Sequence, residues 1–192
     1  TSVVLAFWVR GRCSGIRREA VRVLLRATVG DVVRAAKGYK VEFNPWSEIA
    51  GRCDHASRTI YVAGDPQSPR LWSVYWAAHE VGHALYDPPV VRRPWLLRGG
   101  VFGLMFMLVV AADLSGSWVP LAVALGVAIV FGGLDWFSEF RAYRYAAREA
   151  VQHGAPVPLV RRWLLADAVL VGFFDLGLVV FLSSLLILGV AV

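Results

Sequence analysis

Ala78-His79-Glu80-Val81-Gly82-His83-Ala84 is the stretch of this 192-residue chain from which its fold and chemistry can be argued. It lies inside the run Arg70–Tyr86, which predicts a buried helix ended by Asp87-Pro88-Pro89, because proline cannot continue a helix. A helix turns by about 100° per residue, so residues four apart lie on one face, one turn from each other. His79 and His83 are therefore predicted to face the same way.

Two imidazoles one turn apart can bind a single metal ion, and this spacing with a neighbouring glutamate is typical of zinc peptidases. Glu80 lies beside the two histidines, where its carboxylate can take a proton from a zinc-activated water and pass it to the leaving amine. Gly82 leaves room for a neighbouring strand or the substrate backbone. The stretch predicts a Zn²⁺ site on His79 and His83, with Glu80 as the catalytic base; the alternative is a chance match to a short pattern.

A catalytic zinc ion needs a third protein ligand and an open position. Glu139 is the best candidate, because it falls where an apolar stretch ends; the alternative is a surface glutamate paired with an arginine. Asp135 lies one turn earlier and is a candidate for a residue behind the ligands, or for the third ligand itself. His55 and His153 are the other two histidines, and neither falls in a helix that the sequence predicts strongly.

The composition indicates a membrane protein. Apolar residues make up 57% of the chain, and the mean hydropathy of +0.56 is too high for a soluble protein of this size. The net charge of +6 comes from arginines beside apolar runs, as the positive-inside rule describes, and no motif for nucleic acid is present. We expect a lipid bilayer, and no nucleic acid, as a partner. Cys13 and Cys53 are too few for a disulfide framework or a cysteine zinc site.

Residues 10–94 are predicted to form a small α+β domain. The spacing of apolar residues predicts an amphipathic helix over Ser14–Ala27, a half-buried strand over Tyr39–Phe43 and a short strand over Ile60–Val62. The two strands are expected to pair across the loop that contains Cys53-Asp54-His55.

The rest of the chain predicts about four membrane helices in a mostly α-helical protein. The expected order is the end of a truncated first helix over 1–9, the catalytic region over 10–94, a transmembrane hairpin over 95–138 with spans Trp95–Leu114 and Trp118–Phe137, a cytoplasmic helix over 139–162, and a last span over 163–192. The positions of the basic residues predict that 10–95 and 139–162 lie in the cytoplasm and both termini outside. His79, His83 and Glu139 are thereby expected on one side of the membrane.

In the order and spacing of its motifs, the chain resembles the YugP-like family of bacterial membrane zinc metallopeptidases and, more distantly, the HtpX-like membrane peptidases. The matching stretches are Ser14-Gly15, Cys53-Asp54-His55 with Thr59-Ile60-Tyr61-Val62, the stretch from Ala78 to Ala84, and Glu139-Phe140 with Ala142 and Arg144. The resemblance covers most of the chain.

The resemblance implies a zincin-like domain on the cytoplasmic side of a bacterial inner membrane, with zinc on His79, His83 and Glu139 and with Glu80 as the base. It also implies that Asp54-His55 lies near the site and steadies substrate or the oxyanion; a turn made by the aspartate side chain is the alternative. Family members carry an aspartate two residues after the ligand glutamate, where this chain has Arg141. The contacts that orient the metal-bound histidines are therefore expected to differ.

Three functions are compatible with these motifs. The first is a peptidase that hydrolyses protein or peptide substrates near the membrane. The second is a non-catalytic zinc-binding subunit of a larger membrane complex, which Arg141 favours. The third is an intramembrane protease with Asp135 as a ligand, which ranks last because Asp87-Pro88-Pro89 and two arginines follow the histidine helix at once.

Overall fold

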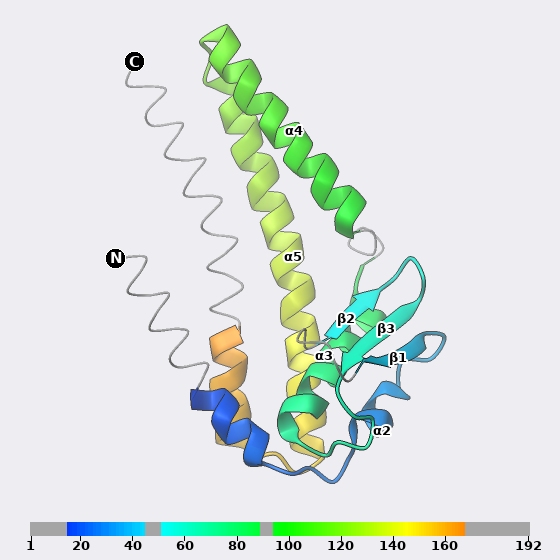
Figure 1. Ribbon diagram of the computed structural model, residues 1–192. Coiled ribbons are helices and arrows are strands. Elements are labelled where there is room, and N and C mark those ends of the chain that lie inside the picture. The colour runs from blue at the N-terminus through cyan, green and yellow to red at the C-terminus, as the bar shows by residue number, and fades with distance from the viewer. Residues whose placement is uncertain (1–14, 45–50, 89–93, 168–192) are drawn as a thin grey trace. The chain divides into compact units, whose positions relative to one another are not determined.

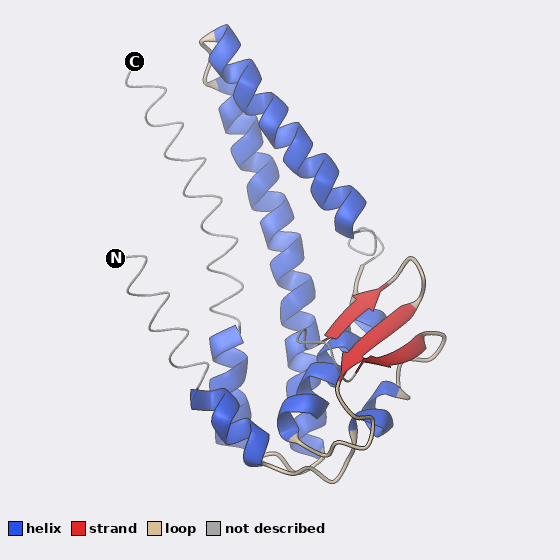
Figure 2. Ribbon diagram, in the orientation of Figure 1, coloured by secondary structure: helices blue, strands red, loops and turns tan. Residues whose placement is uncertain are grey.

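The computed structural model describes residues 15–44, 51–88 and 94–167 (Figures 1 and 2). Its helices and strands, in chain order, are helical residues 15–22, α2 (Val29–Val33), β1 (Lys40–Asn44), β2 (Gly51–Asp54), β3 (Thr59–Ala63), α3 (Leu71–Tyr86), α4 (Pro94–Ser115), α5 (Val119–Gln152) and helical residues 157–167. The chain divides into two compact units. The first comprises Thr1–Pro88 and Ser138–Leu170, and the second comprises Pro89–Phe137 and Val171–Val192.

The sheet of the first unit has the order β1-β3-β2 (Figure 2). β3 is the central strand and is mostly buried, with Ile60 and Val62 almost fully shielded from solvent. It pairs in parallel with β1, where Val41 lies opposite Ile60, and antiparallel with β2, where Cys53 lies opposite Ile60. The predicted pairing of the first and last strands is confirmed, but Cys53 and Asp54 belong to a third strand and not to a loop. β2 escaped prediction because four residues that begin with glycine carry no alternating pattern.

α3 is the central helix of this unit, and it packs against α2, β2 and β3. Leu71, Val74, Tyr75 and Val81 are fully buried, so the predicted buried helix is confirmed to within one residue of its start. The helix ends at Asp87, whose backbone has left the helical conformation while its N–H still donates to the carbonyl of His83.

The C-terminal part of α5 lies directly against α3 at Gly82. A Cβ atom at Gly82 would lie 2.8 Å from the Cα of Ala142, which is closer than side chains pack. The room that we predicted Gly82 leaves for a strand or the substrate is therefore taken by a helix. This close contact brings α5 to the histidine face of α3, because Ala142 lies three residues, or about one turn, after Glu139.

Aromatic stacking joins the first and last described helices of the unit to α3. Trp163 stacks on Tyr75, with ring centroids 4.2 Å apart, and on Trp72 at 5.1 Å, while Arg17 lies over the Trp72 ring. Tyr75 also donates its hydroxyl to the buried carboxylate of Asp167 over 3.3 Å. Trp163 is thus a packed residue of this unit, and most of the predicted span over 163–192 lies outside the described residues.

The helix predicted over Ser14–Ala27 is interrupted. The chain is helical over residues 15–22, after which Leu24 forms an isolated bridge with Arg70. A new helix, α2, then begins at Thr28, which exchanges capping hydrogen bonds with Asp31. Backbone hydrogen bonds to the segment before α3 therefore outweigh the continuous helical pattern of the sequence.

In the second unit, α4 and the N-terminal part of α5 are joined by a tight turn at Gly116, which has a positive φ of 62°. Met105 and Ala128 form its small buried core, and large apolar side chains are exposed along both helices: Leu104, Phe106, Met107, Leu114, Val119, Val123, Ile129 and Val130. Such a surface is unusual for a protein in water.

Within the described residues, α5 is the one helix long and apolar enough to cross a membrane, and α4 contains a shorter apolar stretch, Gly103–Ala112. Only 17% of the most apolar window of α5 is buried, which distinguishes it from the core helix of a soluble protein. The described residues thus contain one candidate span where the sequence predicts about four membrane helices. The predicted helix over 1–9 lies outside them.

Candidate metal centre

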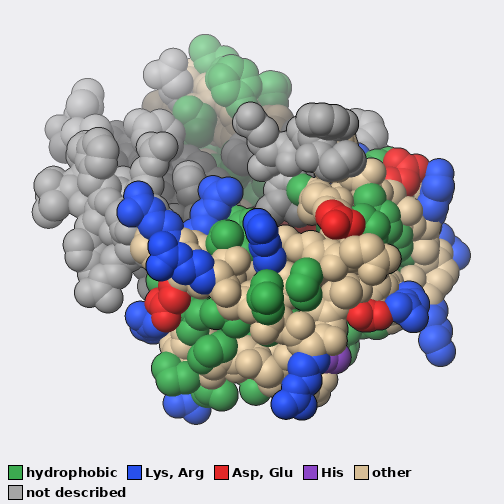
Figure 3. Space-filling model, turned by 60° about the horizontal axis from the view of Figure 1, so that its bottom comes forward, with side chains coloured by type: hydrophobic (Ala, Val, Ile, Leu, Met, Phe, Trp, Pro, Cys, Tyr) green, Lys and Arg blue, Asp and Glu red, His purple; other side chains and the backbone are tan. Residues whose placement is uncertain are grey.

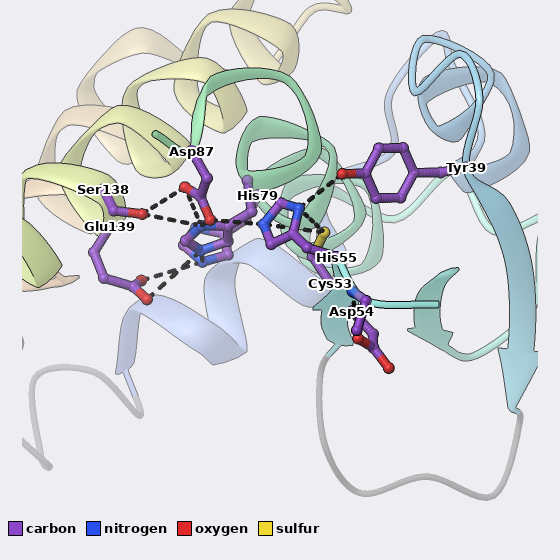
Figure 4. Close-up of polar contacts among 10 residues, drawn as sticks. Tyr39, Cys53, Asp54, His55, His79, Asp87, Ser138 and Glu139 are labelled. Carbon is purple, nitrogen blue, oxygen red and sulfur yellow. Dashed lines mark hydrogen bonds and ion pairs between the residues drawn. The ribbon is translucent and has the colours of Figure 1, made fainter. Parts of the chain in front are cut away.

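His79, His83 and Glu139 come together in the first unit (Figure 4). The Nε2 atoms of His79 and His83 are 3.0 Å apart. One carboxylate oxygen of Glu139 lies 3.4 Å from Nε2 of His79, and the other lies 3.6 Å from Nε2 of His83. α3 supplies both histidines from one face, and α5 supplies the glutamate. The structure thus brings the three predicted ligands together.

The donor set suits a divalent metal ion. The three ligand atoms lie within 4.8 Å of one another, and two imidazoles with one carboxylate are donors that zinc prefers. Although burial opposes it, hydrogen bonds to His79 and His83 hold the pKa of Glu139 well below its usual range. Glu139 is therefore ionised at neutral pH, as a metal ligand must be.

Asp87 orients His83 from behind. Its carboxylate lies 3.0 Å from Nδ1 of His83, on the side of the ring opposite the nitrogen that faces Glu139. Ser138, the residue before Glu139, also donates its hydroxyl to Asp87. A carboxylate that accepts the Nδ1 proton leaves the Nε2 lone pair directed at the metal position, which is the common arrangement behind metal-bound histidines.

His55 extends this contact toward the sheet. Its Nε2 lies 2.9 Å from the second carboxylate oxygen of Asp87, and its Nδ1 lies 2.7 Å from the Tyr39 hydroxyl. Figure 4 shows the His55 ring between Tyr39 and Asp87. Only 4% of the His55 side chain is exposed, so these contacts are shielded from water.

Glu80 is buried beside the two histidines, with 6% of its surface exposed. Burial raises its pKa above the usual value, while the nearby His79 and His83 act in the opposite direction. It lies close to Gly51 of β2, where a Cβ atom would lie 2.6 Å from Cγ of Glu80. Only a glycine fits at this point of β2 without moving the glutamate.

His79 is held differently from His83. Its ring packs against Trp76 and Tyr143, with centroid distances of 5.3 Å and 4.3 Å. Its Nδ1 is buried and has no hydrogen-bond partner among the described residues. Packing against aromatic rings thus fixes the orientation of His79, whereas a carboxylate fixes that of His83.

The other predicted site residues lie in different places. Asp54 points away from the histidines in Figure 4, and its carboxylate accepts the backbone N–H of Ala56 over 3.0 Å. It makes the side-chain turn that was the alternative interpretation. Asp135 lies in the half of α5 that belongs to the second unit, and the metal-binding group of the described residues does not include it.

His83 has an orienting carboxylate although Arg141 stands where members of the YugP-like family carry an aspartate. The guanidinium of Arg141 lies over the ring of Tyr86, 5.2 Å from the centroid, on the exposed side of α5. The carboxylate that contacts Nδ1 of His83 is that of Asp87, which follows α3 in the chain.

The sequence reasoning missed Asp87, Ser138, Tyr39 and Tyr143. Asp87 carried a usable signal, because it lies four residues after His83 and so one helical turn further on the same face. Because Asp87 stands before two prolines, the sequence predicts only that it ends the helix. Tyr39 and Ser138 carried no such signal, since only the folded chain brings them to this region.

No protein-family model matches the chain, and no curated protein or solved structure matches it either. The geometry of the site therefore carries the argument about function.

Proposed function

We propose that this chain is a membrane-anchored zinc peptidase, in keeping with its resemblance to the YugP-like family. The observation that carries the proposal is the convergence of His79, His83 and Glu139 beside the buried carboxylate of Glu80. A glutamate next to a two-histidine, one-carboxylate metal group is the side-chain set that metal-assisted peptide hydrolysis needs.

His79, His83 and Glu139 would hold the ion. A zinc ion bound there supplies a Lewis acid and a water acidic enough to attack a peptide carbonyl near neutral pH. The hydrogen bond from His83 to Asp87 supports this assignment, since it directs the Nε2 lone pair of His83 toward the other two ligands.

Glu80 would move the proton. Because burial raises its pKa, its carboxylate is a stronger base than an exposed glutamate and can also return the proton to the leaving amine. A pKa shifted toward the working pH favours both halves of this exchange.

The substrate would be an extended peptide aligned with β2. β2 forms one edge of the described sheet, and its first residue, Gly51, lies against Glu80. One side of an edge strand is not bonded to another strand, and an extended chain can add there independently of its side chains. A peptide added there lies close to the catalytic carboxylate.

The exposed apolar side chains of α4 and the apolar part of α5, residues 119–137, support a membrane anchor. Lys and Arg side chains are spread over the face of the molecule that Figure 3 shows. The positive-inside rule then favours a cytoplasmic position for the metal centre in a bacterial inner membrane.

The decisive experiment compares metal content and peptidase activity in the purified, detergent-solubilised chain. We expect about one zinc per chain, and we expect Glu80→Gln to keep the metal while cleavage of an unfolded protein substrate falls about 10²–10⁴-fold, the usual contribution of a general base. Glu42→Gln is a matched control, since Glu42 forms an exposed ion pair with Lys40 on β1.

Wild-type protein without stoichiometric zinc would contradict the metal site itself. Zinc at one per chain with no cleavage of any unfolded substrate would instead favour the second function, a non-catalytic subunit of a membrane complex.

A further inference from the structure

A continuous network of buried and partly buried polar groups leads from the candidate metal centre into the sheet. Starting at His83, it passes through Asp87 and His55 to the hydroxyl of Tyr39, over contacts of 3.0, 2.9 and 2.7 Å. All four residues of this network lie in the first compact unit, and the exposed fractions of the His55 and Asp87 side chains are 4% and 7%. Water therefore competes little with these contacts.

Each hydrogen bond in this chain determines the direction of the next. If His83 uses Nε2 as a metal ligand, its Nδ1 carries the proton and donates to Asp87. Asp87 as a carboxylate only accepts, so His55 must donate to it from Nε2. A neutral His55 then has an acceptor at Nδ1, and the Tyr39 hydroxyl supplies the matching donor.

The chain joins three separate elements. Asp87 is the C-terminal cap of α3, His55 follows the last residue of β2, and Tyr39 directly precedes β1. Any movement of the sheet relative to α3 therefore changes the position of the Asp87 carboxylate. The same sheet carries Gly51 against Glu80, so its position also determines where the catalytic carboxylate lies.

We infer that His55 and Tyr39 are positioning residues that couple the metal centre to the sheet: they hold Asp87 on His83, and metal binding in turn holds β2 and β3 in place beside Glu80. The inference rests on the metal site of the proposed function. Its consequence is that the strand edge meant for substrate is fully ordered only when the metal is bound.

The first test is zinc affinity, measured on the detergent-solubilised full chain by competition with a chromophoric chelator. His55→Leu removes the donor to Asp87 and lowers zinc affinity by up to about 10-fold, less than the 10–100-fold usual for losing a partner directly behind a metal-bound histidine, here Asp87. His55→Gln places an amide N–H near the position of Nε2 and recovers part of the loss. Tyr39→Phe gives a smaller decrease than His55→Leu.

Two matched controls belong to this test. Tyr61→Phe removes a hydroxyl from β3 of the same sheet, where the ring of Tyr61 contacts Arg52. His153→Gln alters a histidine near the end of α5 that lies 3.6 Å from Glu149. Both variants keep wild-type zinc affinity.

The second test separates coupling from simple loss of stability. In the wild-type protein, added zinc slows amide hydrogen exchange in β2 and β3, and this protection is lost in His55→Leu while protection of α3 near His79 remains. The visible spectrum of the Co²⁺-substituted protein also changes in His55→Leu, because the orientation of His83 sets the ligand field.

Wild-type zinc affinity and an unchanged Co²⁺ spectrum in His55→Leu would overturn the inference while leaving the proposed function intact. Absence of zinc binding by the wild-type chain and by both control variants would instead contradict the proposed function.

Discussion

His79 and His83 face the same point but are held by different means. Nδ1 of His83 lies beside the buried carboxylate of Asp87, whereas His79 packs against Trp76 and Tyr143 and its Nδ1 has no hydrogen-bond partner among the described residues. A hydrogen bond to a carboxylate makes an imidazole a stronger metal donor. In the proposed metal site, His83 would therefore be the stronger of the two nitrogen ligands, and the position of His79 would depend on its packing against aromatic rings.

Glu139 and Asp135 differ by one helical turn, which allows a direct test of the third ligand. We expect Glu139→Gln to lower zinc affinity at least 10-fold, because it removes the anionic donor, and Asp135→Asn to leave affinity unchanged. Chelator competition on both variants measures this. The reverse result would assign the ligand to Asp135 and support the third function, the intramembrane protease.

The pair of Asp87 and His83 gives the metal-free protein a characteristic pH dependence. Burial opposes ionisation, but hydrogen bonds from His55 and His83 hold the pKa of Asp87 well below its usual range. Its contribution to stability is thus present above the unfolded value of about 4 and is lost as the pH falls. Burial likewise opposes the charged form of His83, yet Asp87 and Glu139 raise its pKa well above the usual value.

The stabilisation from His83 is accordingly full below its unfolded pKa of about 6.5 and is lost as the pH rises through the higher folded value. We expect the metal-free chain to be most resistant to thermal unfolding between about pH 4 and 6.5. Tryptophan fluorescence melts across pH measure this. Asp87→Asn should flatten both sides of the maximum, and a profile equal to that of the wild type would contradict the pairing.

At the scale of elements, the contact between α3 and α5 determines whether the ligands meet. The sequence predicted α3 and the alignment of its histidines well, because a long apolar pattern with a proline stop is a strong local signal. It named Glu139 from its place at the end of an apolar stretch. It could not predict that Gly82 is packed against Ala142, because that contact depends on the approach of two helices.

Gly82→Ala tests this helix contact. Alanine normally stabilises a helix by up to about 1 kcal/mol relative to glycine. Here the added methyl group lies 2.8 Å from Ala142, so we expect a net loss of stability of about 1–3 kcal/mol and a decrease in zinc affinity as Glu139 moves away. Gly133→Ala in α5 is the control, since nothing lies within 4 Å of its added atom. Equal behaviour of the two variants in thermal melts would refute the argument.

At the scale of the whole molecule, α5 is an uninterrupted helix of 34 residues that carries both an apolar stretch and the third ligand. The sequence predicted the two parts as separate segments, a span and a cytoplasmic helix. Hydropathy distinguishes apolar from polar stretches, but it does not reveal whether the backbone continues between them. The ordered network of Tyr39, His55 and Asp87 was equally beyond prediction, because its members come from three separate elements.

The proposed membrane anchor predicts a position-dependent effect of charge. Ile129→Lys places a charge in the exposed apolar part of α5, where insertion costs about 2.5–3.5 kcal/mol, and should increase the fraction of protein extracted from membranes by alkaline carbonate. Gln152→Lys adds the same charge at the exposed end of the same helix and should remain in the membrane fraction. Extraction of the wild-type chain itself would contradict the anchor.

The close contact between Gly51 and Glu80 also limits which alignments of β2 fit against α3. Gly51 lies opposite Val62, and a shift of β2 by one position would bring Arg52 or Ala50 to the point where even a single carbon atom collides with Glu80. A shifted strand would therefore have to displace the Glu80 side chain before the sheet could pack on α3. Glu80, the residue proposed to carry the chemistry, thus also disfavours other alignments of β2.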